Sequence, residues 1–157
     1  MLPELTTEKE KLKNTVLARR LFEYLEKENK ELFKYLYDKG ELKEFVLYRS
    51  NAAHDEYISA FSDGMYSPDE VANQQLFIGI ENSYFEYIES LVKDNFYKYF
   101  KKIEKKPSAK YNEIISNLVF DCMEVFYEYI SCSYIDVMDS LDRELITALD
   151  KIINIKN

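Results

Sequence analysis

The chain has 157 residues, of which 46% are hydrophobic and 15% aromatic, so it can bury a sizeable core and lacks the composition of a disordered protein. It contains only 3 glycines and 3 prolines, which are too few for the frequent turns of an all-β protein. Its net charge of −8 argues against a nucleic-acid-binding protein, which usually carries a basic face.

Two helices are predicted in the first 64 residues. The first begins at Thr7, where Thr7 and Glu10 fit a capping box. Its apolar residues recur at intervals of three, four or seven as far as Gly40, which can take the positive φ of a helix end. The second predicted helix covers residues 41–62 and stops at Gly64.

The clearest helix start in the sequence is Ser67-Pro68-Asp69-Glu70. It places serine at the N-cap, proline at the first helical position and acids in the first turn. This third helix is predicted to continue to Phe100, with Gly79 inside it at a close helix crossing. Lys101 to Lys110, which includes Pro107, is the evident connector.

A fourth helix is predicted from Ser108, and a regular amphipathic stripe extends from Tyr134 to Ile152. Ser131-Cys132-Ser133 contains neither glycine nor proline, so a bend there and one continuous helix both fit. Because every predicted helix is apolar on one side, the chain is predicted to be all-α. We expect a single-domain helical bundle of four to six helices over residues 1–157, with a bend or connector at 101–110.

No catalytic, cofactor-binding or metal-binding residues are predicted. His54 is the only histidine, and it is interpreted as a partly exposed helical side chain. One histidine cannot supply the two Glu-x-x-His motifs of a di-iron bundle. The three glycines stand apart at positions 40, 64 and 79, so there is no glycine-rich phosphate loop. The sequence therefore predicts a protein that is not an enzyme and needs no cofactor.

No membrane or secretory segment is predicted. Residues 1–13 contain no apolar run suited to a signal peptide, and no stretch approaches 18 uncharged apolar residues. Cys122 and Cys132 lie in helix-like sequence and are predicted to be reduced thiols. A cytoplasmic location is expected.

The charge is unevenly distributed along the chain. Residues 41–97 carry 3 basic and 11 acidic groups, residues 98–110 carry 6 and 1, and residues 111–157 carry 3 and 9. The lysines of 98–110 alternate with Tyr97, Tyr99 and Tyr111, a pattern that could grip a single strand. The favoured interpretation is a solubilising helix end whose lysines offset the helix dipole, so no direct nucleic-acid partner is expected.

Five acidic residues are the candidate partner-binding residues. Glu124 and Glu128 lie four apart, and Asp136, Asp139 and Asp142 lie three apart, so each set shares one helix face. Such a face is most often simply solvated, and acid–base work or a divalent cation are further alternatives. The hypothesis is that these carboxylates contact a protein partner, such as a nuclease with a basic nucleic-acid channel.

The alternative hypothesis is a homodimer or larger homo-oligomer with a structural or accessory role. The chain contains 14 tyrosines, and tyrosine is favoured at protein interfaces because it combines contact area with a polar tip. Tyrosine-rich faces would then pair between copies of the chain.

A wider pattern lies between residues 21 and 96, about half of the chain. It consists of Arg49, Ala53, Tyr57, Ala60 and Gly64, then Tyr66-Ser67-Pro68-Asp69-Glu70, then Gly79-Ile80 and Ser83-Tyr84. This pattern resembles a family of short proteins of unknown function carried by conjugative transposons of Bacteroidetes. It departs from that family by the extra residue Met65 and by a shorter spacing from Ser67 to Gly79. One branch of the family includes anti-CRISPR inhibitors of the Cas9 nuclease, so the resemblance implies a mobile-element protein and supplies no catalytic residue.

Overall fold

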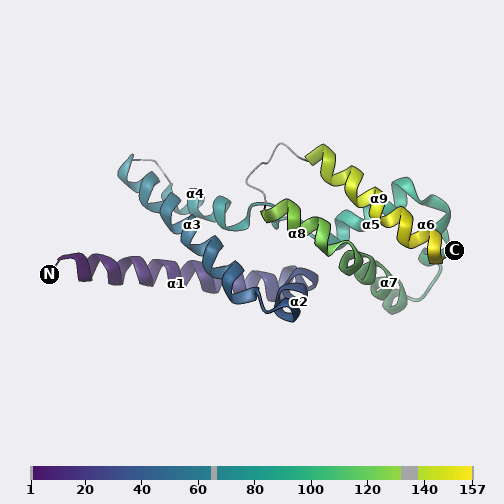
Figure 1. Cartoon of the computed structure of the whole chain (residues 1–157), viewed down its shortest axis with the longest axis horizontal. Coiled ribbons are helices and arrows are strands. Elements are labelled where there is room, and N and C mark those ends of the chain that lie inside the picture. Colours follow the sequence, from purple (N-terminus) through teal and green to yellow (C-terminus); the bar gives the residue numbers. More distant parts are fainter. Residues whose placement is uncertain (1, 65–66, 132–137, 157) are drawn as a thin grey trace. The chain divides into compact units, whose positions relative to one another are not determined.

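The computed structural model describes residues 2–64, 67–131 and 138–156, and the side chains of 15–64, 67–131 and 140–154. Within those ranges the chain forms nine α-helices and no strand (Figure 1). The predicted number of four to six helices is wrong, because several predicted helices are interrupted. No described helix is long and apolar enough to cross a membrane.

The chain divides into two compact units, unit 1 over residues 1–81 and unit 2 over residues 82–157. The helices of unit 1 are α1 (Leu2–Glu28), α2 (Lys30–Lys39), α3 (Leu42–Ser62) and α4 (Pro68–Phe77). The helices of unit 2 are α5 (Tyr84–Asn95), α6 (Tyr97–Glu104), α7 (Ser108–Asp121), α8 (Met123–Ser131) and α9 (Met138–Lys156). Each unit has its own core.

The first predicted helix is two helices. It begins at Leu2 rather than at Thr7, and the side chains of the predicted capping box lie outside the described ones. It breaks at Asn29, which is 1% exposed and whose side chain accepts a hydrogen bond from the backbone N–H of Leu32 at 3.4 Å. Asparagine favours such a local bond over the helical ladder, and it caps α2.

The third predicted helix is divided into α4, α5 and α6. Gly79 does not sit inside a helix at a crossing, because it has a φ of 78° in the turn that follows α4. Ser83 then caps α5 by accepting a hydrogen bond from the N–H of Glu86 at 3.2 Å. A second break occurs at Phe96, whose φ of −133° is not helical.

The fourth predicted helix begins at Ser108, as predicted, and it breaks at Cys122 between α7 and α8. The backbone N–H of Cys122 donates to the carbonyls of both Leu118 and Val119, as at a tightened helix end. The question of a bend at 131–133 falls largely on residues outside the described ones. Three residues, 105–107, connect α6 to α7.

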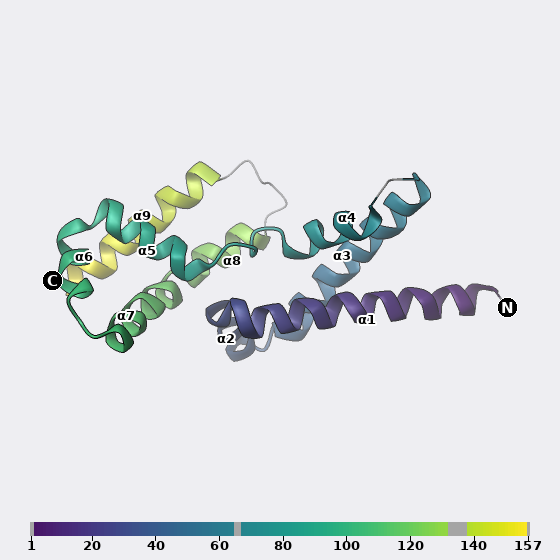
Figure 2. The same cartoon turned by 180° about the vertical axis from the view of Figure 1, so that it is seen from behind.

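Unit 1 is organised by α3, which packs against both α1 and α4 (Figure 2). Its apolar core comes from all four helices and the turn after α4: Leu17, Leu21, Leu25, Leu32, Leu36, Phe45, Val46, Ala53, Ala60, Ala72, Leu76 and Ile80. The hydroxyl of Tyr24 on α1 donates to the carbonyl of Ile80 at 2.8 Å, and Arg20 donates to the side chain of Asn73. These bonds fix α1 against α4 and the turn after it.

Arg49 of α3 is a charged side chain buried in unit 1. It is 4% exposed, and its guanidinium donates to the carbonyls of Leu76 at 3.3 Å and Ile78 at 2.6 Å. The ring of Phe45, centred 5.2 Å from the guanidinium carbon, stacks beside it. Because helix ends leave carbonyls without partners, this arginine completes the C-terminal end of α4.

Unit 2 packs around Phe126 of α8, which is 1% exposed. The ring of Tyr84 on α5 stacks on it with centroids 4.0 Å apart and planes at 6°, and Tyr87 contacts its edge at 6.0 Å. The helix α5 also packs against α7 and α9. Aromatic contacts therefore hold α5 at the centre of this unit.

Two serines provide a matched test of helix capping. Ser67 precedes α4 but makes no side-chain capping bond, whereas Ser83 caps α5. Ser83→Ala should lower the free energy of unfolding by about 1 kcal/mol, and Ser67→Ala by only a few tenths. Urea denaturation of both variants measures the difference. A larger loss in Ser67→Ala than in Ser83→Ala would contradict the capping geometry.

Replacement of Arg49 tests the contact between α3 and α4. Arg49→Met keeps an apolar stem but leaves the carbonyls of Leu76 and Ile78 without this donor, so it should cost about 2 kcal/mol of stability. The control is Arg19→Met, at an exposed position of α1, which should change the unfolding free energy little. Equal midpoints for the two variants in urea would show that the buried bonds contribute nothing.

Candidate interaction surfaces

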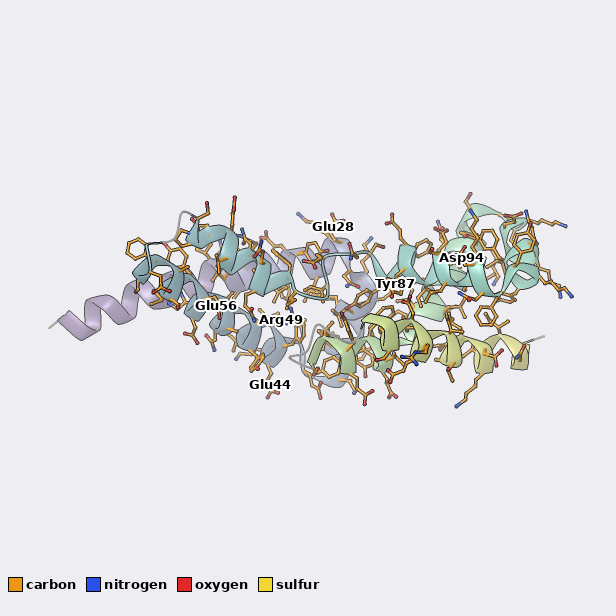
Figure 3. All side chains as sticks on the ribbon, turned by 90° about the horizontal axis from the view of Figure 1, so that it is seen from above. Glu28, Glu44, Arg49, Glu56, Tyr87 and Asp94 are labelled. Carbon is orange, nitrogen blue, oxygen red and sulfur yellow. The ribbon has the colours of Figure 1, made fainter. Side chains whose placement is uncertain are left out.

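The solvent side of α3 is acidic. Glu44, Tyr48, Asn51 and Asp55 follow one another at spacings of four, three and four, which places them on one helix face, and all four are exposed. The opposite face holds the buried residues of α3, so this row points away from the core of unit 1. Figure 3 shows Glu44, Arg49 and Glu56 along this helix.

More carboxylates lie where α3 ends and α4 begins. We define the α3–α4 acidic surface as the exposed residues Glu44, Asp55, Glu56, Asp63, Asp69 and Glu70. Residues 41–81 contain 8 acidic and 2 basic residues, and one of the two bases is the buried Arg49. Lys43 is thus the one exposed base among them, and the surface seen by a partner is strongly negative.

Large apolar side chains accompany these acids. Tyr48 is 74% exposed, Phe61 67%, and Leu47 and Ile58 41% each, all on α3. The ring of Tyr57 stacks on Phe61 with centroids 6.3 Å apart. Exposed aromatic side chains next to charges are typical of protein interfaces, where the ring supplies buried area.

The residues predicted to bind a partner belong to unit 2, whereas this surface belongs to unit 1. Glu124 and Glu128 are exposed on α8. Asp136 lies outside the described residues, and the side chain of Asp139 on α9 lies outside the described side chains. Asp142 is half-buried, and its carboxylate accepts a hydrogen bond from the hydroxyl of Tyr87 on α5.

Two tyrosine–carboxylate bonds therefore connect the helices of unit 2. Tyr87 joins α5 to α9 through Asp142, and the hydroxyl of Tyr111 on α7 donates to Glu89 of α5 at 2.5 Å. Burial raises the pKa of both tyrosines above the ordinary value of 10.0, and the hydrogen-bonded carboxylates raise each pKa further. Figure 3 labels Tyr87 on α5.

An open groove of about 540 Å³ lies between α9 and the α7–α8 pair. Apolar atoms of Val125, Ala148 and Ile152 line it, together with the charged residues Glu128 and Lys151. It is wide and shallow, unlike the enclosed pockets that bury most of a small ligand. Its polar groups include no histidine and no cysteine, so it offers no nucleophile–base pair.

His54 and Cys122 are both buried, and they belong to different units. His54 on α3 is 9% exposed, so the expectation of a partly exposed histidine is wrong, and neither ring nitrogen has a hydrogen-bond partner among the described residues. Cys122, in unit 2, is a free thiol that is fully buried, and burial raises its pKa to about 12. A thiol with such a pKa stays protonated and unreactive near neutral pH. Among the described residues no group of three histidine, cysteine or acidic side chains is placed to hold a metal ion.

A lysine-rich surface occupies α6 and the connector that follows it. Lys98, Lys101, Lys102, Lys105 and Lys106 are all exposed there, and Lys101 pairs with Glu104 at 3.0 Å. Its charge is opposite to that of the α3–α4 acidic surface.

The sequence contained a usable signal for the α3–α4 acidic surface. The excess of acids between residues 41 and 97 indicates an acidic segment without selecting a residue within it. The apolar stripe through Phe45, Ala53 and Ala60 predicts that Glu44 and Asp55 lie on the solvent side of α3. The same stripe places Arg49, four residues after Phe45 and four before Ala53, on the buried face, but it does not reveal the carbonyls of Leu76 and Ile78 that bind the guanidinium.

Comparison with known proteins identifies a family. A family model described as a domain of unknown function (DUF1896) matches residues 15–155, which include parts of both units. No curated protein and no solved structure matches the chain. The match covers most of the chain and assigns it no activity, so function is argued from the surfaces described above.

The raised pKa values of Tyr87 and Tyr111 predict a loss of stability at high pH. The stabilisation is fully present below pH 10 and is lost as the pH rises further, because the unfolded chain releases these protons first. The free energy of unfolding in urea should therefore hold up to about pH 10 and fall as the pH rises above it. The fall should be smaller in the double variant Tyr87→Phe, Tyr111→Phe.

The matched control is Tyr37→Phe, Tyr48→Phe, at tyrosines that are 68% and 74% exposed. This variant should lose stability at high pH as steeply as the wild type. A fall of wild-type steepness in the Tyr87, Tyr111 variant would show that these bonds do not couple folding to proton release.

Proposed function

The chain belongs to the family of the domain of unknown function DUF1896, and from that premise we propose that it is a non-enzymatic cytoplasmic protein that binds another macromolecule through exposed acidic helix faces. The observation that carries the proposal is the α3–α4 acidic surface, whose carboxylates are exposed while the arginine of the same segment is buried. The surface that a partner meets therefore carries negative charge with almost no positive charge to offset it.

The partner is a protein with a basic channel for nucleic acid. A surface dense in carboxylates can occupy such a channel and compete with the phosphates that it normally holds. The resemblance of residues 21–96 to short mobile-element proteins supports a nuclease as the partner, and an anti-CRISPR role against a Cas nuclease as the specific form. Glu124 and Glu128, exposed on α8, provide a second acidic face, and Asp136 and Asp139 extend the same hypothesis.

Asp142 has a different part in this proposal. Its carboxylate is engaged by Tyr87, so it holds α9 against α5 and contributes to the contact only indirectly. Changing Asp142 together with its neighbours would therefore mix a loss of stability with a loss of charge. The test is better made on α3, where Glu44, Asp55 and Glu56 are exposed.

The second candidate function is self-association. The exposed Tyr48, Leu47, Ile58 and Phe61 give α3 an apolar component that two copies could bury against each other. Light scattering coupled to size exclusion separates this alternative from the first. A stable oligomer that persists after removal of the acids would favour it.

The test of the acidic surface uses a triple variant, Glu44→Gln, Asp55→Asn, Glu56→Gln. Binding to a purified Cas9–guide RNA complex should weaken about tenfold, mainly through slower association, because exposed interface charges act chiefly on the association rate. Biolayer interferometry at low and physiological salt measures both rates. Target DNA added in excess should displace the bound protein.

The matched control is Glu23→Gln, Glu26→Gln, Asp38→Asn, which removes three exposed charges from α1 and α2. It should bind as the wild type does, and circular dichroism of both variants should be unchanged. Absence of binding by the wild type, absence of competition with DNA, or equal loss in both variants would each contradict the proposed function.

A further inference from the structure

The exposed side of α6 carries a row of lysines. This helix buries Phe100 and Ile103, which are 9% and 2% exposed. Lys98, Lys102 and Lys105 follow at spacings of four and three, so they share one side of the helix, directed away from the buried pair. All are exposed, so the fold holds their charges toward solvent.

Most of these charges lack a carboxylate partner within the described part of the chain. Lys101 pairs with Glu104 at 3.0 Å, and Lys110 of α7 lies 3.8 Å from Glu113. Four other lysines of residues 98–106 form no ion pair with any described residue. They are Lys98, Lys102, Lys105 and Lys106. We call these four residues, with Lys101, the α6 lysine cluster.

The arrangement of the α6 lysine cluster is unfavourable for the helix itself. Lys98 and Lys102 within α6, and Lys101 and the C-cap residue Lys105, are like-charge pairs four residues apart, a spacing that destabilises helices. The helix dipole favours lysines in the last turn, but Lys98 stands in the first turn, where no acid balances it. The role of a solubilising helix end therefore explains only part of the α6 lysine cluster. A bound polyanion would reduce the repulsion between its lysines.

An aromatic ring lies beside the charges. Tyr97 is 57% exposed and precedes Lys101 by four residues on the same helix, and the ammonium nitrogen of Lys101 lies 5.2 Å from its ring centroid. Lysines that track a phosphate backbone, combined with rings on which bases stack, are typical of sequence-independent binding of single strands. Tyr97 supplies such a ring at the edge of the cluster.

We propose that the α6 lysine cluster, with Tyr97, is a binding surface for a single-stranded nucleic acid. A membrane surface is disfavoured because the apolar residues of α6, Phe100 and Ile103, are buried in the core of unit 2. A duplex would offer phosphates but no unstacked base to Tyr97. This inference is independent of the proposed function, since it concerns another unit and the opposite charge.

The first measurement is fluorescence anisotropy of a labelled 20-nucleotide oligo-dT with the whole chain. Neutralising four phosphates of a single strand gives a log–log salt dependence of about −3, so the affinity should fall about fiftyfold between 50 and 200 mM salt. Duplex DNA of the same length and vesicles containing phosphatidylserine should bind more weakly at equal phosphate concentration. No binding at 50 mM salt, or tighter binding to the duplex or the vesicles, would overturn the proposal.

The second measurement compares two variants of equal net charge. The cluster variant is Lys98→Gln, Lys102→Gln, Lys105→Gln, Lys106→Gln, and the control is Lys27→Gln, Lys30→Gln, Lys43→Gln, Lys93→Gln, at exposed lysines outside the cluster. The cluster variant should lose most of the affinity and of the salt dependence, and the control should keep both to within a few-fold. Equal losses would show that general electrostatics, and not this surface, attracts the strand.

Tyr97→Leu tests the aromatic part by itself. Loss of one base-stacking contact should weaken oligo-dT binding about fivefold or more while the salt dependence stays the same. An unchanged affinity would overturn the assignment of single-stranded nucleic acid. Circular dichroism verifies that α6 is retained, and the lysine replacements should not unfold it because they remove like-charge pairs.

Discussion

The contact between the buried guanidinium of Arg49 and the end of α4 is the constraint on which unit 1 depends. A charged side chain at 4% exposure is tolerated because it donates to two backbone carbonyls, at 2.6 and 3.3 Å. The bonds fix where α4 ends relative to α3. They also withdraw a positive charge from the surface, so a contact that stabilises the fold sets the charge that a partner meets.

The sequence predicted where several helices begin and failed to predict where they break. The starts near Leu42, at Pro68 and at Ser108 were found because serine, proline or glycine marks them. The breaks at Asn29, Phe96 and Cys122 carry no such marker, and the apolar periodicity continues through them. Each is stabilised by a hydrogen bond or by packing in the folded chain, which local pattern does not reveal.

The candidate surfaces, like the helices, could be predicted from the sequence only in part. Segments of acidic and basic charge were evident, since charge is a property of residues. The role of each acid was not evident, because it depends on distant neighbours. Asp142 is held by Tyr87, which lies 55 residues earlier in the chain, whereas Glu124 and Glu128 remain exposed. Only tertiary packing separates structural carboxylates from those available to a partner.

The single-residue breaks have a consequence for the kinetics of folding. Breaks at Asn29, Phe96 and Cys122 let the chain change direction between consecutive helices, so that α1 contacts α2, α5 contacts α6 and α7 contacts α8 within each unit. Proteins whose contacts are local fold in microseconds to milliseconds, because little loop entropy is lost before the core forms. A ribosome adds about 5–20 residues per second, so the leucines of unit 1 can be buried before the tyrosines of unit 2 have been synthesised.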